Sequence, residues 1–472
     1  MSLSKKIQRV MKLNFENLGP IKQGTLQVNA LTLLCGPNNS GKTYITNILY
    51  FLIRYRRNDT LTLLRNALNE MVINQKEYQE LDILDLYHRS NINLENSRFK
   101  RLLLKSLAIT SDLHPNLKLD FDIPFNQKWI EDSLDSKRGR FHIKKEANST
   151  KIKIKQISQA TAEELAEGSV TKIQRLLNGD ARVTIRILTM DILSTAFGNH
   201  VFCLSAERSG LITFKNELEF YKKEVNKLLE KLELSEPDEF FDQEFFARDY
   251  PESVEVGAHL LQDIPNIIRR NSKSKLLEEN PHLLTLLEKI TGGSYKLDDI
   301  DNLMFELNND ISLKVTEAST SIKSLAILWV WVCFIAKEGS TLLIDEPELN
   351  LHPKNQRLLA RFISELVKAK VNVFITTHSD YIIREFNSLI LMQYPQNHIP
   401  KIKEKFGYAE YEKLNSSLIN AYITDPIEQN NRPLFNLKKL DVTPLNGIAI
   451  QSFDDQILEM NLLQNSIMYG ED

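Results

Sequence analysis

The chain has 472 residues, 42% of them hydrophobic and 26% charged, so it is long enough for a large core and more than one structural unit. Its 59 basic and 62 acidic side chains give a net charge of −3, and this balance favours neither nucleic acid nor a membrane surface as a partner. The three cysteines have no CxxC spacing, and no apolar run is long enough to span a membrane. We therefore expect a cytoplasmic protein with reduced thiols and no membrane partner.

The first predicted elements are a strand, a glycine-bounded loop and a helix. The apolar run QVNALTLLCG precedes the loop GPNNSGKT, and apolar residues recur at helical spacing after it. This order is the setting of a phosphate-binding loop, although a chance glycine-rich turn is the alternative. Glycines let backbone N–H groups face phosphate oxygens, a lysine reaches the terminal phosphates and a threonine hydroxyl can bind Mg²⁺. The predicted ATP-binding residues are Gly36, Pro37, Asn38, Asn39, Ser40, Gly41, Lys42 and Thr43.

Residues 51–200 combine helical and polar segments with two basic clusters. The stretch DSKRGRFHIKKE (135–146) alternates as in a β-hairpin with its turn at Gly139. Its basic residues beside Phe141 and His142 could contact nucleic acid, but a solvated hairpin tip is the simpler interpretation.

The next region is predicted to be mainly helical. Residues 214–234 place apolar side chains along one helical face, over a length too short for a coiled-coil arm; the side chains are Leu218, Tyr221, Val225, Leu228 and Leu232. The stretch PHLLTLLEKITGGSYKL then predicts a helix that turns into a strand at Gly292 and Gly293.

A second apolar strand, within STLLIDEPELNLHP (340–353), ends in two carboxylates. A carboxylate at the end of a strand can hold the Mg²⁺ of a nucleotide bound to the neighbouring loop, and the next acid can polarise a water in line with the γ-phosphate. We assign Asp345 to the metal, together with Thr43, and Glu346 to the role of general base.

The strand VNVFITTHSD (371–380) carries His378 at its end. This histidine is predicted to hydrogen-bond the γ-phosphate; a solvent-facing loop histidine is the alternative. The remaining tail contains no DxD, histidine pair or CxxC, so we do not expect a nuclease on this chain. Its last segment has an apolar stripe, for which core packing is the first interpretation and an interface helix the second; the stripe is Phe453, Ile457, Met460, Leu463 and Ile467.

Together GPNNSGKT, LLIDEPELNLHP and FITTHSD resemble the ATP-binding-cassette heads of the RecF, SMC and overcoming-lysogenization-defect group, and most of all the AAA-15 type of ATPase. CLSAERSGL (203–211) is similar to the PAERxG strand end of this family, and TEASTSIKSLAIL (316–328) stands at its signature segment. The resemblance implies an α/β fold: a P-loop head with a central mixed sheet flanked by helices, plus a mainly helical insertion. The head would comprise 1–50, 201–212 and 291–395, with insertions at 51–200 and 213–290 and a C-terminal segment, 396–472, as a candidate contact with a partner or second protomer.

The resemblance also implies a homodimer of heads or a higher oligomer. Ser319, Thr320 and Ser321 of one protomer would face the γ-phosphate held by the other, and residues 348–352 would connect the two sites. There is no LSGGQ, and Ser321 stands where a glycine is more usual. A plain helix N-cap is the alternative for this segment, and both interpretations can hold together.

The leading functional hypothesis is an ATP-hydrolysing sensor or scaffold subunit whose effector is encoded separately. Such ATPases resemble those of bacterial anti-phage systems: Septu and certain retrons, which pair with an HNH nuclease, and PARIS, which pairs with a TOPRIM-like toxin. A phage protein would be a candidate trigger. The alternative is a RecF-like repair ATPase that clamps duplex DNA on ATP binding, which the balanced charge disfavours.

Overall fold

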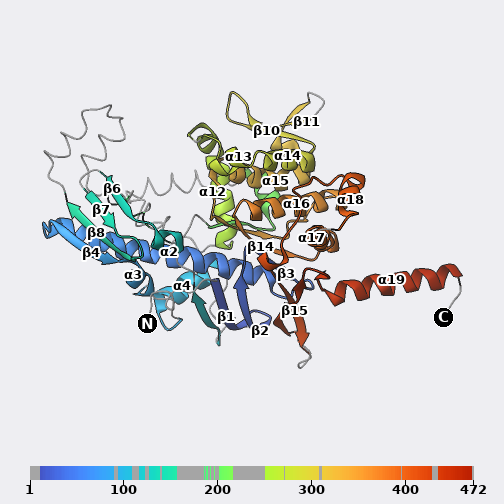
Figure 1. Ribbon diagram of the computed structural model, residues 1–472, viewed down its shortest axis with the longest axis horizontal. Coiled ribbons are helices and arrows are strands. Elements are labelled where there is room, and N and C mark those ends of the chain that lie inside the picture. Colours follow the sequence, from blue (N-terminus) through green and yellow to red (C-terminus); the bar gives the residue numbers. More distant parts are fainter. Residues whose placement is uncertain are drawn as a thin grey trace. The chain divides into compact units, whose positions relative to one another are not determined.

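The computed structural model describes most of the chain, and its secondary-structure elements are labelled in Figure 1. The described residues are 11–89, 94–108, 116–122, 127–138, 141–156, 201–215, 250–270, 272–307, 311–394, 396–427 and 434–469, with single positions between 185 and 196. No helix in these segments has both the length and the apolar character needed to cross a bilayer. The chain forms two compact units, 1–14, 48–104 and 118–201 in the smaller, and 15–47, 105–117 and 202–472 in the larger.

The larger unit is built on a mixed sheet, as predicted. Its strand order is β2-β16-β15-β3-β14-β13-β9. Strand β3 pairs in parallel with β14 on one side and β15 on the other, and β14 pairs in parallel with β13. The bounds are β2 Ile21–Val28, β3 Leu31–Cys35, β9 Val201–Leu204, β13 Thr341–Asp345, β14 Asn372–Thr377, β15 Ile419–Ile427 and β16 Leu434–Leu440. The residues of β3 and β13 are all buried, as is typical of parallel strands covered on both faces.

Helices flank this sheet, which confirms the predicted fold class. Helix α16 packs on β14 and also against α14 and α17, and these helices gather on one side of the sheet in Figure 1. The bounds are α9 Arg208–Thr213, α12 Glu252–Arg270, α13 Lys275–Glu279, α14 His282–Thr291, α15 Thr320–Val330, α16 Pro353–Lys368, α17 Asp380–Leu391 and α18 Ile399–Phe406. Short turns are η2 Val315–Glu317, the π-helical η3 Trp331–Ile335, and η4 Ser416–Leu418. Helix α2, Lys42–Ile73, begins at the glycine-bounded loop.

The predicted turn after residue 291 is confirmed. Helix α14 ends at Gly292, whose φ of +76° is the left-handed conformation in which glycine terminates helices, and β10 follows at once. Two small sheets complete the unit, with strands β10 Gly293–Leu297, β11 Leu303–Leu307, β12 Ser312–Lys314, β17 Val442–Thr443 and β18 Gly447–Ile448. The helix predicted at 214–234 lies outside the described residues from 216 onward.

The chain ends in α19, Gln451–Tyr469. Three members of the predicted apolar stripe, Met460, Leu463 and Ile467, are 59%, 60% and 73% exposed. The core interpretation of this stripe is therefore wrong for them, because helical periodicity shows which side chains share a face but not whether anything covers it.

The smaller unit contains a four-stranded antiparallel sheet in the order β4-β8-β7-β6, with Ile152, Ile154, Phe141 and Ile143 buried on one face. Strands β6 and β7 form the predicted hairpin, in the register Arg138 to Phe141. The bounds are β4 Tyr78–Asp82, β5 Lys118–Asp122, β6 Leu134–Arg138, β7 Phe141–Lys145, β8 Lys151–Gln156, α3 Ile83–Arg89, α4 Ser97–Ser106 and α5 Gln127–Glu131. Strand β1, Met11–Leu18, begins in this unit and ends in the larger one.

Candidate active site

The glycine-bounded loop follows β3 and leads into α2. Gly36 has a φ of +144° and Gly41 a φ of +94°, values that side-chain-bearing residues rarely adopt. A Cβ on Gly36 would lie 1.8 Å from Thr424 Oγ1, and one on Gly41 would lie 2.8 Å from a side-chain carbon of Ile21. Both positions therefore require glycine, for conformation and for space.

Lys42 lies inside the curl of this loop. Its side chain is buried, and its Nζ donates to the carbonyl oxygens of Gly36 at 3.0 Å and Pro37 at 2.8 Å. Burial lowers the pKa of the Lys42 ammonium, while the carboxylates of Glu346 and Asp345 act in the opposite direction. A cation held this way by neutral carbonyls is positioned to transfer its hydrogen bonds to phosphate oxygens.

The two predicted halves of the site meet through a hydrogen bond. Thr43 donates from Oγ1 to Oδ2 of Asp345 at 2.8 Å, across 302 residues of sequence. The strand register explains this contact, because Asp345 pairs with Thr376 on β14 while Thr377 pairs with Cys35 on β3. The carboxyl ends of three parallel strands thus meet at one edge of the sheet, where ligands of open α/β sheets bind.

Asp345 has the surroundings of a carboxylate that holds a cation. It is 2% exposed, and the Thr376 hydroxyl donates to its other oxygen. Burial raises the pKa of Asp345, although the hydroxyls of Thr376 and Thr43 partly counteract this. A nearby cation would offset the cost of burying this charge, and a hydroxyl beside a carboxylate is the oxygen donor set that Mg²⁺ takes from proteins. The residues therefore fit a magnesium ion.

Glu346 and His378, the predicted base and phosphate contact, are brought together. The backbone of Glu346 has a φ of +49°, unusual for a residue with a side chain, and its N–H donates to Thr376 Oγ1 at 3.0 Å. Its Oε1 is 3.5 Å from Nδ1 of His378. Both side chains remain partly exposed, at 21% and 34%, so they can be reached by water and by a nucleotide.

Glu348, predicted only as part of a connecting loop, fixes the backbone of His378. Its Oε1 accepts from Thr377 Oγ1 at 2.8 Å and from the N–H of His378 at 2.9 Å. Its other oxygen, Oε2, is buried and has no hydrogen-bond partner among the described residues. A buried acid therefore connects the segment after β13 to the end of β14.

Two further residues of the site were missed by the sequence analysis. Arg208 donates to the backbone carbonyl oxygens of Asp345 at 2.9 Å and Glu346 at 2.7 Å. Thr424, on β15, donates from Oγ1 to Ser40 of the glycine-bounded loop at 2.7 Å. The only sequence signal was CLSAERSGL for the arginine; a lone buried threonine has none.

The predicted signature segment forms the start of α15. Ser319 is the N-cap, its hydroxyl lies 2.9 Å from that of Ser321, and its side chain caps no N–H of the helix. Thr320 is exposed. Within the described part of the chain, the side chains of Ser319 and Ser321 hydrogen-bond each other.

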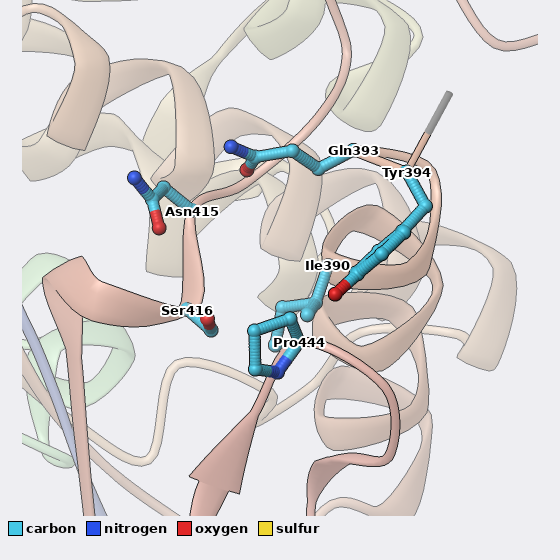
Figure 2. A pocket seen from close by; sticks show the side chains of 6 residues that line it. All are labelled: Ile390, Gln393, Tyr394, Asn415, Ser416 and Pro444. Carbon is cyan, nitrogen blue, oxygen red and sulfur yellow. The ribbon is translucent and has the colours of Figure 1, made fainter.

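A separate surface pocket of about 260 Å³ lies near the end of α17 (Figure 2). Its lining residues carry amide, hydroxyl and apolar groups but no charge: Ile390, Gln393, Tyr394, Asn415, Ser416 and Pro444. It therefore offers no cation for a phosphate and is not the nucleotide site.

Fold and site together define a nucleotide-binding head with a phosphate loop and an acidic strand end. The AAA ATPase domain family, AAA_15, matches residues 9–383, and the chain belongs to this family. The protein is accordingly an ATPase that hydrolyses ATP.

Known proteins similar to the chain include an ATP/GTP phosphatase of Helicobacter pylori (strain ATCC 700392 / 26695), 23% identical over 81% of this chain and 88% of the relative. Among solved structures, the Smc head domain of Pyrococcus furiosus bound to the C-terminal domain of ScpA is 14% identical, with a TM-score of 0.36, over 96% of this chain and 98% of that one. The SMC head domain of Thermotoga maritima is 10% identical, with a TM-score of 0.31, over 92% and 100% of the two chains.

Proposed function

We propose that ATP is hydrolysed at the edge of the sheet where β3, β13 and β14 end. The observation that carries this proposal is the hydrogen bond from Thr43 to Asp345, which unites the phosphate loop with the acidic strand end. Residues 36–43 would bind the phosphates, with Lys42 on the terminal ones. Thr43 and Asp345 would hold Mg²⁺, which neutralises developing negative charge on the phosphates.

The remaining chemistry falls to two side chains. Glu346 accepts a proton from, or orients, the attacking water, and its partly exposed carboxylate has room for that water. His378 donates to the γ-phosphate and, lying 3.5 Å from Glu346, aligns the phosphate with the base. In this arrangement positioning and charge stabilisation provide the rate enhancement.

Two substitutions test these assignments separately. Lys42→Ala removes the buried cation and should abolish nucleotide binding, measured with a fluorescent ATP analogue. Glu346→Gln keeps the shape but removes the base, so binding should persist while phosphate release falls at least about 100-fold. Normal hydrolysis by Glu346→Gln would show that another group activates the water.

Two heads would close on ATP, with Ser319, Thr320 and Ser321 of one facing the γ-phosphate of the other. The start of α15 supports this proposal, because the Ser319 side chain does not cap it and the N–H groups at a helix N-terminus attract anions. The Glu346→Gln protein, which retains ATP, should sediment as a dimer or higher oligomer with ATP and as a smaller species without it. The same sedimenting species with and without ATP would contradict ATP-dependent association of the heads.

At the level of the cell, we propose a sensor or scaffold subunit of a bacterial anti-phage defence system that controls a separately encoded nuclease or toxin. ATP does useful work in such a switch only if it binds two conformations differently. The exposed apolar side chains of α19 support a protein contact within 396–472. Co-purification of the product of an adjacent gene with the full chain, but not with a chain ending at residue 450, would support this proposal and identify the partner. Tight ATP-dependent binding of duplex DNA by the protein alone would instead support the clamp alternative.

A further inference from the structure

Arg208 is the first residue of α9 and is 2% exposed. Besides its bonds to Asp345 and Glu346, its Nη1 donates to the carbonyl oxygen of Ser205 at 3.0 Å. One guanidinium thus connects the end of β9 to the end of β13, two segments 137 residues apart. The contact to Asp345 and Glu346 is made to peptide oxygens, so it leaves both carboxylates free for the reaction.

Burying this cation is costly, because the guanidinium stays charged inside a protein. Burial lowers the pKa of Arg208, and the surrounding carboxylates of Glu348, Asp345 and Glu346 oppose that shift. The hydrogen bonds recorded for the guanidinium in the described part of the chain all end on carbonyl oxygens. The backbone therefore fixes the position of the guanidinium. An arginine in a surface ion pair would be freer to move.

The backbone that Arg208 holds needs support. Glu346 has a φ of +49°, and residues without glycine's freedom adopt this region only when neighbours stabilise it. Thr376 fixes the N–H of Glu346 from one side, and Arg208 fixes its carbonyl oxygen from the other. With both neighbouring peptide groups held, the direction in which the Cα–Cβ bond of Glu346 leaves the backbone is set.

We propose that Arg208 is a positioning residue for ATP hydrolysis that acts through Glu346. It aims the carboxylate at the attacking water without touching the nucleotide. The proposal rests on Glu346 as the general base. It assigns to the strand end of CLSAERSGL a role in turnover, separate from binding.

The arrangement predicts a loss of turnover without a matching loss of affinity. A glutamine at position 208 in Arg208→Gln cannot reach both carbonyl oxygens, so the carboxylate of Glu346 would no longer be held in position. A displacement of a catalytic group by about 1 Å costs on the order of 100-fold in rate. We expect kcat to fall by about that factor, while KM and the affinity for a fluorescent ATP analogue stay within about 3-fold. Arg208→Lys keeps the charge but not the planar fork, and should recover part of the rate. Arg89→Lys, at an exposed arginine paired with Asp85, is the matched control and should change nothing.

A double-mutant cycle with Glu346→Gln tests whether the effect passes through the base. The rate of single-turnover hydrolysis by Arg208→Gln/Glu346→Gln should be within about 3-fold of the rate of Glu346→Gln alone. Once the carboxylate has been removed, Arg208 has no catalytic group left to position. Multiplied losses would overturn the proposal. So would a parallel loss of nucleotide affinity in both the Gln and Lys variants, since this would show a purely structural role. If Glu346→Gln alone retains hydrolysis, the base assignment fails and this proposal fails with it. If Glu346→Gln stalls hydrolysis but Arg208→Gln keeps the wild-type kcat, only the role of Arg208 is overturned.

Discussion

At the scale of residues, the candidate site members proposed from the sequence are those that belong to a motif of fixed spacing. Lys42 and Thr43 sit in such a motif, and the structure places Asp345 beside Thr43. The contacts of Arg208 and Thr424, which cross 137 and 384 residues of sequence, were not predicted, because neither residue type at its position indicates by itself which backbone or side chain it will meet. A buried arginine and a solvated one look identical in a sequence.

Asp345→Asn should stabilise the protein while destroying its activity. Burial raises the pKa of Asp345 above its ordinary 3.8, so the neutral form is favoured in the folded state. The contribution of Asp345 to the stability of the fold is therefore fully present below its ordinary pKa of 3.8. This contribution is lost as the pH rises through the raised pKa of the folded state. The nucleotide-free variant should therefore melt at a higher temperature than the wild type at neutral pH, and hydrolysis should fall to background. Glu338→Gln, at an exposed acid, is the control; an unchanged or lower midpoint for Asp345→Asn would contradict the expectation.

Gly36→Ala should abolish nucleotide binding. The new methyl group would meet Thr424 Oγ1 at 1.8 Å and the backbone nitrogen of Thr424 at 3.2 Å, and a φ of +144° strains any side chain. The loop must therefore move away from β15. Gly210→Ala is the matched control, because a Cβ there meets nothing within 4 Å. Calorimetric titration with ATP should show binding only for the control variant.

At the scale of elements, strands and turns with an internal pattern were predicted well. The hairpin of β6 and β7 and the turn from α14 into β10 follow from alternation and from paired glycines. Helix α19 shows where this reasoning stops. Its apolar periodicity matches that of a core helix, yet Leu458, Leu462 and Met468 are also 58% or more exposed. A pattern records that a face is apolar, whereas burial depends on the rest of the fold.

Alanine substitutions in two helices should separate these cases. Leu366 on α16 is fully buried, and Leu366→Ala should lower the free energy of unfolding by about 2–5 kcal/mol through the cavity it leaves. Leu462 on α19 is 66% exposed, and Leu462→Ala should change the free energy of unfolding by less than about 0.5 kcal/mol. Urea unfolding of the two variants, followed by tryptophan fluorescence, measures both. Equal costs would show that α19 is packed within the free protein.

At the scale of the whole molecule, the sheet joins segments from both ends of the chain. The sequence analysis ended the head at residue 395, yet the sheet continues with β15 and β16, which lie between β3 and β2. The order of the strands could not be predicted here, because the residues of a strand do not show which other strands pair with it. The register from Ile419–Leu31 to Ile423–Cys35 also brings Thr424 to the loop, so the tail contributes a hydrogen bond to the candidate nucleotide site.

Two truncations should therefore behave differently. A chain ending at residue 395 lacks β15 and β16, which leaves one side of β3 and one side of β2 without hydrogen-bond partners in the middle of the sheet. We expect this chain to be insoluble or to bind no ATP. A chain ending at residue 450 loses only α19, most of whose described side chains are exposed, and should keep its ATP affinity and hydrolysis rate. Expression with gel filtration and ATP titration of both proteins tests the difference. A soluble, ATP-binding product ending at 395 would show that the first 395 residues form a complete head and that β15 is dispensable.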